Sequence, residues 1–283
     1  MTRALIVIFH RYPGMTLGFD RILGEYFKKQ LDLWGNEVNK IYLVNSNNYL
    51  ENITHNNIER LNTNNLSHAQ NLNAIFPLVK EDYIAIIDMD TIIYQKGRLG
   101  GYFGLLEAYD VCSFIEKHGE HIDRFCPYFF VGKRSIFPEN PDFSENPPEY
   151  LDPFSKLTHE LLKKDLKILE IKDDRSTIQL GKEGIIRSGD FRPTGTYHIR
   201  NFMGGIILLD TYLTDKKSFR IRFEPMPFEE VTRLFAWAWL INKKTLNLFN
   251  LEEVMLEILD KEMGISEEKW EEFMEEFKDY HDK

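Results

Sequence analysis

The sequence YIAIIDMD occupies residues 83–90 and joins five apolar or aromatic residues to two aspartates. A continuous apolar run of this length is typical of a β-strand that is buried on both faces of a parallel sheet. We therefore predict a strand over residues 83–87, with Asp88 and Asp90 at its carboxyl end. Two neighbouring carboxylates at the end of a buried strand are unfavourable unless a positive group binds them. The stretch thus predicts a fold with a parallel sheet and negative charge at the carboxyl end of one of its strands.

Other strands and helices precede this one in alternating order. Strands are predicted at residues 4–9 and 40–44, and helices at residues 19–33 and 67–76. Ser67 is a suitable N-cap for the second helix, which Pro77 should end. This alternation indicates a doubly wound α/β sheet. Ligands of such sheets bind beyond the carboxyl ends of the strands, where Asp88 and Asp90 are expected.

The chain after residue 90 is less regular. Short apolar runs predict strands at 111–115, 128–131, 168–171 and 205–209, and helices are expected at 150–164 and 228–242. Four prolines between residues 138 and 148 exclude a helix there. Residues 270–277 show helical apolar spacing inside an acidic C-terminal segment. We expect one domain over residues 1–245 and a helical extension over residues 246–283.

Composition and charge exclude several classes of protein. The 283 residues carry a net charge of −10, and residues 251–283 hold 13 acidic side chains against 4 lysines. A nearly neutral body with an acidic tail offers no basic surface, so we expect no nucleic-acid partner. No apolar run is long enough to span a bilayer, and no signal peptide is indicated. Two cysteines, Cys112 and Cys126, make no disulfide framework and favour a reducing, cytoplasmic compartment.

The two aspartates suit a hard divalent cation. Mg²⁺ and Mn²⁺ prefer carboxylate oxygens and readily share phosphate oxygens. A cation held by Asp88 and Asp90 would neutralise a diphosphate leaving group as its bond to a sugar breaks. The sequence therefore favours Mn²⁺ or Mg²⁺ as the cofactor.

Three parts of the chain resemble glycosyltransferases of the GT-A type, in particular the family 2-like group. They are residues 4–9, the stretch SHAQNLN (67–73) together with residues 83–90, and the stretch PYFFVGKR (127–134). The resemblance spans residues 3–210 and implies a GT-A-like, doubly wound mixed sheet with a Rossmann-like nucleotide-binding half. It also implies transfer of a sugar from a UDP- or GDP-linked donor to a hydroxyl acceptor on a glycan, lipid or protein.

The resemblance assigns roles to residues at the predicted edge. Asp88 would face the ribose or the metal, and Asp90 would coordinate the metal directly. Asn45, at the end of the second strand, would recognise the base or the ribose. His68 and Asn73 would border the nucleotide from the helix that begins at Ser67 in the sequence pattern.

Further candidates come from stretches before and after this block. His10 and Arg11 follow the first strand and are candidates for lining the base pocket. The resemblance implies a late histidine as third metal ligand, for which His198 is the candidate. Arg200, two residues further on, would reach a phosphate.

A catalytic base is needed if the transfer inverts the sugar, because a carboxylate must accept the proton of the acceptor hydroxyl. The resemblance puts such a group at a helix N-terminus after the basic turn. Asp152 is the first choice and Glu149 the second, with Glu229 and Glu230 as a third option. Capping of the helix is the structural alternative for Asp152.

Other classes share parts of the pattern. Haloacid-dehalogenase-like phosphatases also have an apolar strand ending in Asp-x-Asp, but they want Thr or Val where this chain has Ile92. Sugar-nucleotide nucleotidyltransferases share the sheet, but their Gly-rich, basic loop matches residues 10–14 poorly. A catalytically inactive sugar-binding relative is the third alternative.

Two aromatic segments leave several interpretations open. The helix expected at 228–242 suits core packing, a platform for sugar stacking, or contact with a membrane surface as a peripheral protein. The apolar stripe of residues 270–277 suits packing or a homodimer contact.

Overall fold

The computed structural model describes residues 1–9, 17–46, 50, 52–63, 66–88, 91–93, 96–118, 121–143, 153–171 and 185–187, with scattered positions between 253 and 275. The chain divides into two compact units. The first comprises Met1–Arg11, Phe27–Asp173 and Gly181–Ile186, and the second comprises Tyr12–Tyr26, Asp174–Leu180 and Arg187–Lys283. The border expected between residues 245 and 246 lies outside the described residues and stays a prediction.

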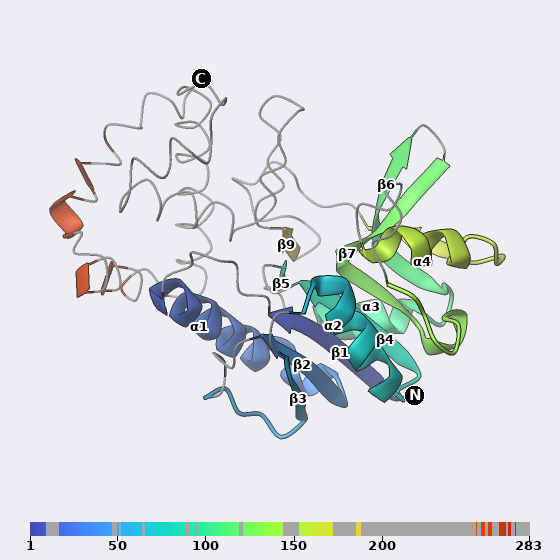
Figure 1. The fold of residues 1–283 in the computed structure, drawn as a ribbon, viewed down its shortest axis with the longest axis horizontal. Helices are drawn as coiled ribbons and strands as arrows, with labels where there is room; N and C mark the ends of the chain where they lie inside the picture. Colours follow the sequence, from blue (N-terminus) through green and yellow to red (C-terminus); the bar gives the residue numbers. More distant parts are fainter. Residues whose placement is uncertain are drawn as a thin grey trace. The chain divides into compact units, whose positions relative to one another are not determined.

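The first unit is built on a seven-stranded sheet with the order β3-β2-β1-β4-β7-β6-β8 (Figure 1). Its strands are β1 (Arg3–Phe9), β2 (Lys40–Ser46), β3 (Ile58–Thr63), β4 (Tyr83–Asp88), β6 (Val111–His118), β7 (His121–Lys133) and β8 (Ile168–Glu170). Neighbouring strands from β3 to β4 pair in parallel, whereas β7 pairs antiparallel with both β4 and β6. The sheet is therefore mixed, which confirms the expected α/β class with a mixed sheet.

The register brings the carboxyl ends of four parallel strands to one edge of the sheet. Ile8 of β1 pairs with Val44 of β2 and with Asp88 of β4. On the outer side, Ser46 of β2 pairs with Thr63 of β3. We call this row of strand ends, from Thr63 to Asp88, the carboxyl edge.

Four α-helices and three short 3₁₀-helices are described. They are α1 (Leu17–Trp34), η1 (Gly35–Glu37), α2 (His68–Ile75), η2 (Phe76–Leu78), α3 (Arg98–Leu105), η3 (Arg134–Ile136) and α4 (Pro153–Leu161). The helices expected at 19–33 and 67–76 are thus confirmed, and the one expected at 150–164 is α4. Gly35 packs against the ring of His55, and a Cβ atom added to Gly35 would lie 3.0 Å from His55 Nε2.

Alternate residues of the buried strands supply two separate apolar layers, as the period of a strand requires. One layer contains Ala4, Ile6 and Ile8 of β1 and is covered by α2, η2 and α4. Phe76 and Phe154 of those helices join a cluster of aromatic rings with Phe137 and Phe143.

The opposite face of the sheet packs against α3. Tyr102 of α3 meets Phe129 of β7 edge to face, with their ring centroids 5.1 Å apart. Phe103 of α3 stacks on Tyr83 of β4 at 6.5 Å. The sheet is therefore buried on both faces, which is why residues 83–87 are almost uniformly apolar.

The structure contains three elements that the sequence pattern did not predict, α3, β5 (Thr91–Ile93) and β9 (Ile185–Arg187), and it differs from the expectations at two other strands. Residues 58–63 form the edge strand β3, which is only half-buried and carries polar side chains, so it gives no apolar run. β7 begins at His121, well before the strand expected at 128–131, and a bulge interrupts its pairing with β6 between Ser113 and Ile115. In the bulged region the hydroxyl of Thr158 on α4 accepts the Phe125 N–H at 2.9 Å.

Two further points concern the rest of the chain. A separate two-stranded sheet joins β5 to β9. The strand expected at 205–209 and the helix expected at 228–242 lie outside the described residues. Within the described part of the chain, no helix combines the length and the apolar character needed to cross a membrane.

Candidate functional site

Asp88 is the last residue of β4 and stands on the carboxyl edge, as the sequence predicts. Its Oδ1 lies 3.5 Å from Nε2 of His68, the first residue of α2. Both side chains are 27% exposed, so solvent reaches them although the surrounding strands are buried. The structure thus brings together two residues that the sequence resemblance assigned to one nucleotide-binding site.

The start of α2 is fixed by a reciprocal pair of hydrogen bonds. The Gln70 N–H donates to Ser67 Oγ at 3.3 Å, and the Ser67 N–H donates to Gln70 Oε1 at 2.8 Å. This capping box confirms Ser67 as N-cap and satisfies N–H groups that a helix start leaves unpaired. The N-terminus of a helix carries a partial positive charge, which favours an anion beside His68.

A buried polar pair ties the same helix to the end of β3. The Thr63 hydroxyl donates to Asn71 Oδ1 at 2.8 Å, and Asn71 Nδ2 donates to the Leu66 carbonyl at 3.4 Å. Thr63 is 7% exposed and Asn71 is fully buried. Sequence reasoning missed both residues, although an asparagine between the buried Ala69 and Leu72 is a signal that could have been used.

Asn45 and Asn73 lie in different positions. Asn45 pairs in register with Phe9 and Asn62, so its backbone belongs to the carboxyl edge. Asn73 is on α2, and its Oδ1 accepts the N–H of Phe143 at 3.1 Å. This bond ties α2 to the segment that leads toward the candidate bases. The nucleotide-binding roles of both asparagines stay predictions.

Several candidate residues lie outside the described part of the chain. They are His10, Arg11, Asp90, Glu149, Asp152, His198 and Arg200. Helix α4 begins at Pro153, the residue that follows Asp152 in the sequence. The roles of all seven side chains therefore stay predictions.

The donor atoms at the carboxyl edge suit a divalent cation in their chemistry. Asp88 offers carboxylate oxygens and His68 an imidazole nitrogen, and both groups bind Mn²⁺. No group of three or more His, Cys, Asp or Glu side chains comes together among the described residues. A complete metal site would therefore need donors from beyond the described residues or from a bound ligand.

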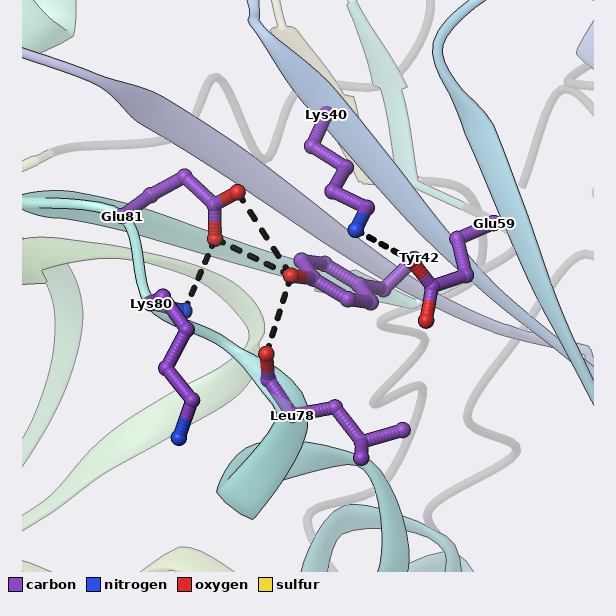
Figure 2. A network of polar contacts seen from close by, with 6 residues as sticks. All are labelled: Lys40, Tyr42, Glu59, Leu78, Lys80 and Glu81. Atoms are coloured by element: carbon purple, nitrogen blue, oxygen red, sulfur yellow. Dashed lines mark hydrogen bonds and ion pairs between the residues drawn. The ribbon is translucent and has the colours of Figure 1, made fainter.

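The opposite, amino edge of the sheet holds a different polar network, which Figure 2 shows. The Tyr42 hydroxyl donates to the Leu78 carbonyl and lies 3.1 Å from Glu81 Oε2, while Lys40 pairs with Glu59. Burial, followed by the charge of Glu81, raises the pKa of Tyr42. These bonds connect β2 to the turn that leads into β4, so we assign them a structural role.

Comparison with known proteins adds likeness of fold. A scan against models of protein families found no match to the sequence, and a search of curated proteins found no similar one. Among solved structures, the chain is similar to a mannosyltransferase of Pyrobaculum calidifontis in complex with GDP-Man and Mn²⁺. The identity is 11% and the TM-score 0.44, with 97% of this chain and 84% of that chain covered.

Two other similar structures come from different enzymes. The bifunctional IspDF of Campylobacter jejuni has 11% identity and a TM-score of 0.44, over 89% of this chain and 90% of that one. The 4-diphosphocytidyl-2C-methyl-D-erythritol synthase of Anaerococcus prevotii has 11% identity and a TM-score of 0.39, over 62% and 88%. Glycosyltransferases are thus among the similar structures, as the sequence resemblance implied. At such identities the chemistry has to follow from the residues of this chain.

Proposed function

We propose that this protein is a metal-dependent glycosyltransferase that moves a sugar from a UDP- or GDP-linked donor to a hydroxyl acceptor. The observation that carries the proposal is the place of Asp88 at the carboxyl edge, with its Oδ1 3.5 Å from Nε2 of His68. Open α/β sheets bind their ligands at this edge. A diphosphate suits it because a helix N-terminus and a bound cation both attract phosphate oxygens.

The roles of the residues follow from their chemistry. Asp88, with Asp90 and His198 as predicted partners, would hold Mn²⁺ or Mg²⁺. The bound ion would supply a Lewis acid that stabilises charge on the leaving diphosphate. Asp152 or Glu149 would accept the proton of the acceptor hydroxyl.

Calorimetric titration of UDP and GDP with and without Mn²⁺ tests the binding part of the proposal. Asp88→Asn and Asp90→Ala should each weaken metal-dependent binding by about 100-fold or more, since loss of a group that merely supports a ligand costs 10–100-fold. Asp82→Asn is the matched control, because Asp82 precedes β4 and lies about 20 Å from Asp88 along the strand. The carboxylate of Asp82 accepts the Thr2 N–H at 2.7 Å and touches no part of the carboxyl edge.

The control separates a local effect from a change of net charge, because salt screens charges beyond about 10 Å. Asp82→Asn should leave the affinity for a nucleoside diphosphate unchanged. If no nucleoside diphosphate binds, or if binding ignores both Mn²⁺ and Asp88→Asn, the proposal is wrong.

Product analysis distinguishes the alternatives. A glycosyltransferase releases a nucleoside diphosphate when donor and acceptor are both present. A nucleotidyltransferase would instead release pyrophosphate from a nucleoside triphosphate and a sugar phosphate. A phosphatase of the haloacid-dehalogenase type would form an aspartyl phosphate that hydroxylamine traps, and either result would contradict sugar transfer.

A further inference from the structure

The first turn of α2 is attached to both ends of the carboxyl edge. His68, the first residue of the helix, lies beside Asp88 of β4, with 3.5 Å between Nε2 and Oδ1. Asn71, three residues further on, accepts the hydroxyl of Thr63, the last residue of β3, at 2.8 Å. Residues three apart are neighbours on the surface of a helix, so a shift or rotation of α2 would change both contacts together.

The contact at Asn71 is the more restrictive of the two. Asn71 is fully buried and Thr63 is 7% exposed. The side chains of His68 and Asp88 are each 27% exposed. A buried carboxamide is unfavourable unless it makes hydrogen bonds, so α2 is favoured only where Asn71 reaches its partners. The half-buried pair is a weaker restraint, because solvent can replace either partner.

The other end of the same carboxamide holds the chain just before the helix. Asn71 Nδ2 donates to the Leu66 carbonyl at 3.4 Å, and the Asn71 N–H donates to the carbonyl of Ser67, the N-cap, at 2.9 Å. The Thr63 hydroxyl is thus linked through one side chain to the residue that precedes the cap. A buried polar network in which the members have partners favours a single arrangement of the elements that it joins.

We propose that Thr63 and Asn71 are positioning residues, which hold α2 so that His68 lies beside Asp88 and both side chains face one bound nucleoside diphosphate. The inference rests on the proposed function, because it concerns the same nucleotide site. Thr63 and Asn71 act by fixing the helix that carries His68. Binding groups have to be held within about 0.5 Å of the productive geometry, so the loss of a supporting bond lowers affinity even when the fold survives.

Two substitutions of Thr63 separate the hydrogen bond from the rest of the side chain. Thr63→Val keeps the shape and removes the donor, whereas Thr63→Ser keeps the donor. In calorimetric titration of UDP and GDP with Mn²⁺, Thr63→Val should weaken binding by about fivefold, the factor that corresponds to one hydrogen bond of ordinary strength. Thr63→Ser should stay within about twofold of the wild type.

Thr158→Val is the matched control. Thr158 is fully buried on α4, and its hydroxyl donates to the Phe154 carbonyl at 2.7 Å and accepts the Phe125 N–H at 2.9 Å. The substitution removes a buried threonine hydroxyl, as Thr63→Val does, but its partners belong to α4 and β7. It should leave the affinity for the nucleotide unchanged. Equal weakening by Thr158→Val would overturn the proposal, because the effect would then follow stability rather than the position of α2.

A double-mutant cycle with His68→Ala tests whether Thr63 acts through the helix. If the bond serves to position His68, Thr63→Val should change the affinity by less than about twofold once residue 68 is alanine. Independent contributions, in which Thr63→Val costs about fivefold in both backgrounds, would contradict the proposal.

Hydrogen exchange in the ligand-free protein gives a measurement that needs no nucleotide. Amides of residues 70–72 should exchange about fivefold faster in Thr63→Val, and at the wild-type rate in Thr63→Ser and Thr158→Val. Unchanged exchange in Thr63→Val would overturn the positioning role. A wild type that binds neither UDP nor GDP overturns the proposed function itself. A wild type that binds one of them, combined with unchanged affinity in Thr63→Val, overturns the role of Thr63 and Asn71 alone.

Discussion

The hydrogen bond between Thr63 and Asn71 should couple the end of β3 to the start of α2. We expect Thr63→Val and Asn71→Leu each to lower the free energy of unfolding by about 1–3 kcal/mol, since each removes the buried hydrogen bond between the two side chains. The Thr63 hydroxyl oxygen and Asn71 Oδ1 lie 2.8 Å apart. Thr63 is 7% exposed and Asn71 is 0% exposed, so water replaces the lost partner poorly. Both substitutions keep the branched shape of the side chain and leave no cavity, but leucine is larger than asparagine, so the cost of Asn71→Leu includes some overpacking.

The double variant is the informative one. With both polar groups gone, the pair becomes apolar, and its cost should fall below the sum of the single costs by about 1–2 kcal/mol. Some cost should remain, because the Leu66 carbonyl loses the donor that Asn71 provides. The same coupling should appear in hydrogen exchange at the first amides of α2, and thus beside His68 and Asp88.

Urea unfolding followed by the fluorescence of Trp34 provides the assay. Trp34 is fully buried in the first unit, and the other three tryptophans can be replaced by phenylalanine. A probe in one unit is needed because a chain of two units need not unfold in one step. Strict additivity of the two single variants would refute the reasoning, since it would mean that the bond contributes nothing to the position of α2.

Three further predictions concern other parts of the first unit. The hydrogen bond from Lys133 holds the pKa of Asp110 below its ordinary value, so this carboxylate stabilises the fold above about pH 4. That contribution is lost as the pH falls through the lowered pKa. Asp110→Asn should therefore reduce the loss of stability at acid pH, which urea midpoints measured between about pH 7 and pH 2 would show. Burial raises the pKa of the Cys112 thiol to about 11, so iodoacetamide at pH 8 should modify it in urea and leave it unmodified in the folded protein, as mass spectrometry would show. Gly132→Ala should destabilise the fold by about 1–3 kcal/mol in urea unfolding, because the new Cβ would lie 2.8 Å from a ring carbon of the buried Phe130.

The parts of the fold that sequence predicts are those in which local pattern and tertiary environment agree. The run at 83–87 is buried on both faces, so its residues are almost uniformly apolar and the strand is evident. Ser67 and Gln70 form their capping box within one turn, so the start of α2 needs no knowledge of the rest of the chain. The alternation of such strands and helices along the chain indicates a parallel sheet, and the position of the carboxyl edge follows from it.

The parts that sequence does not predict depend on partners far along the chain. β3 lies at the margin of the sheet, so its side chains need not be apolar and no run marks it. Gln30 has the spacing of a core position but the chemistry of a surface one, and only its bond to Ile93 explains the conflict. The Thr63–Asn71 bond likewise joins a strand and a helix that sequence patterns treat separately.

The charges at the carboxyl edge bear on whether a metal is needed. The N-terminus of a helix is equivalent to about half a positive charge, which favours one nearby anion. Asp88 already provides an anion at this edge, with its Oδ1 3.5 Å from Nε2 of the His68 side chain. A diphosphate brought to the same place would add further negative charge, and like charges at short range repel each other. A divalent cation bound at Asp88 would turn both repulsions into attractions, which is the electrostatic argument for including a metal in the proposed function.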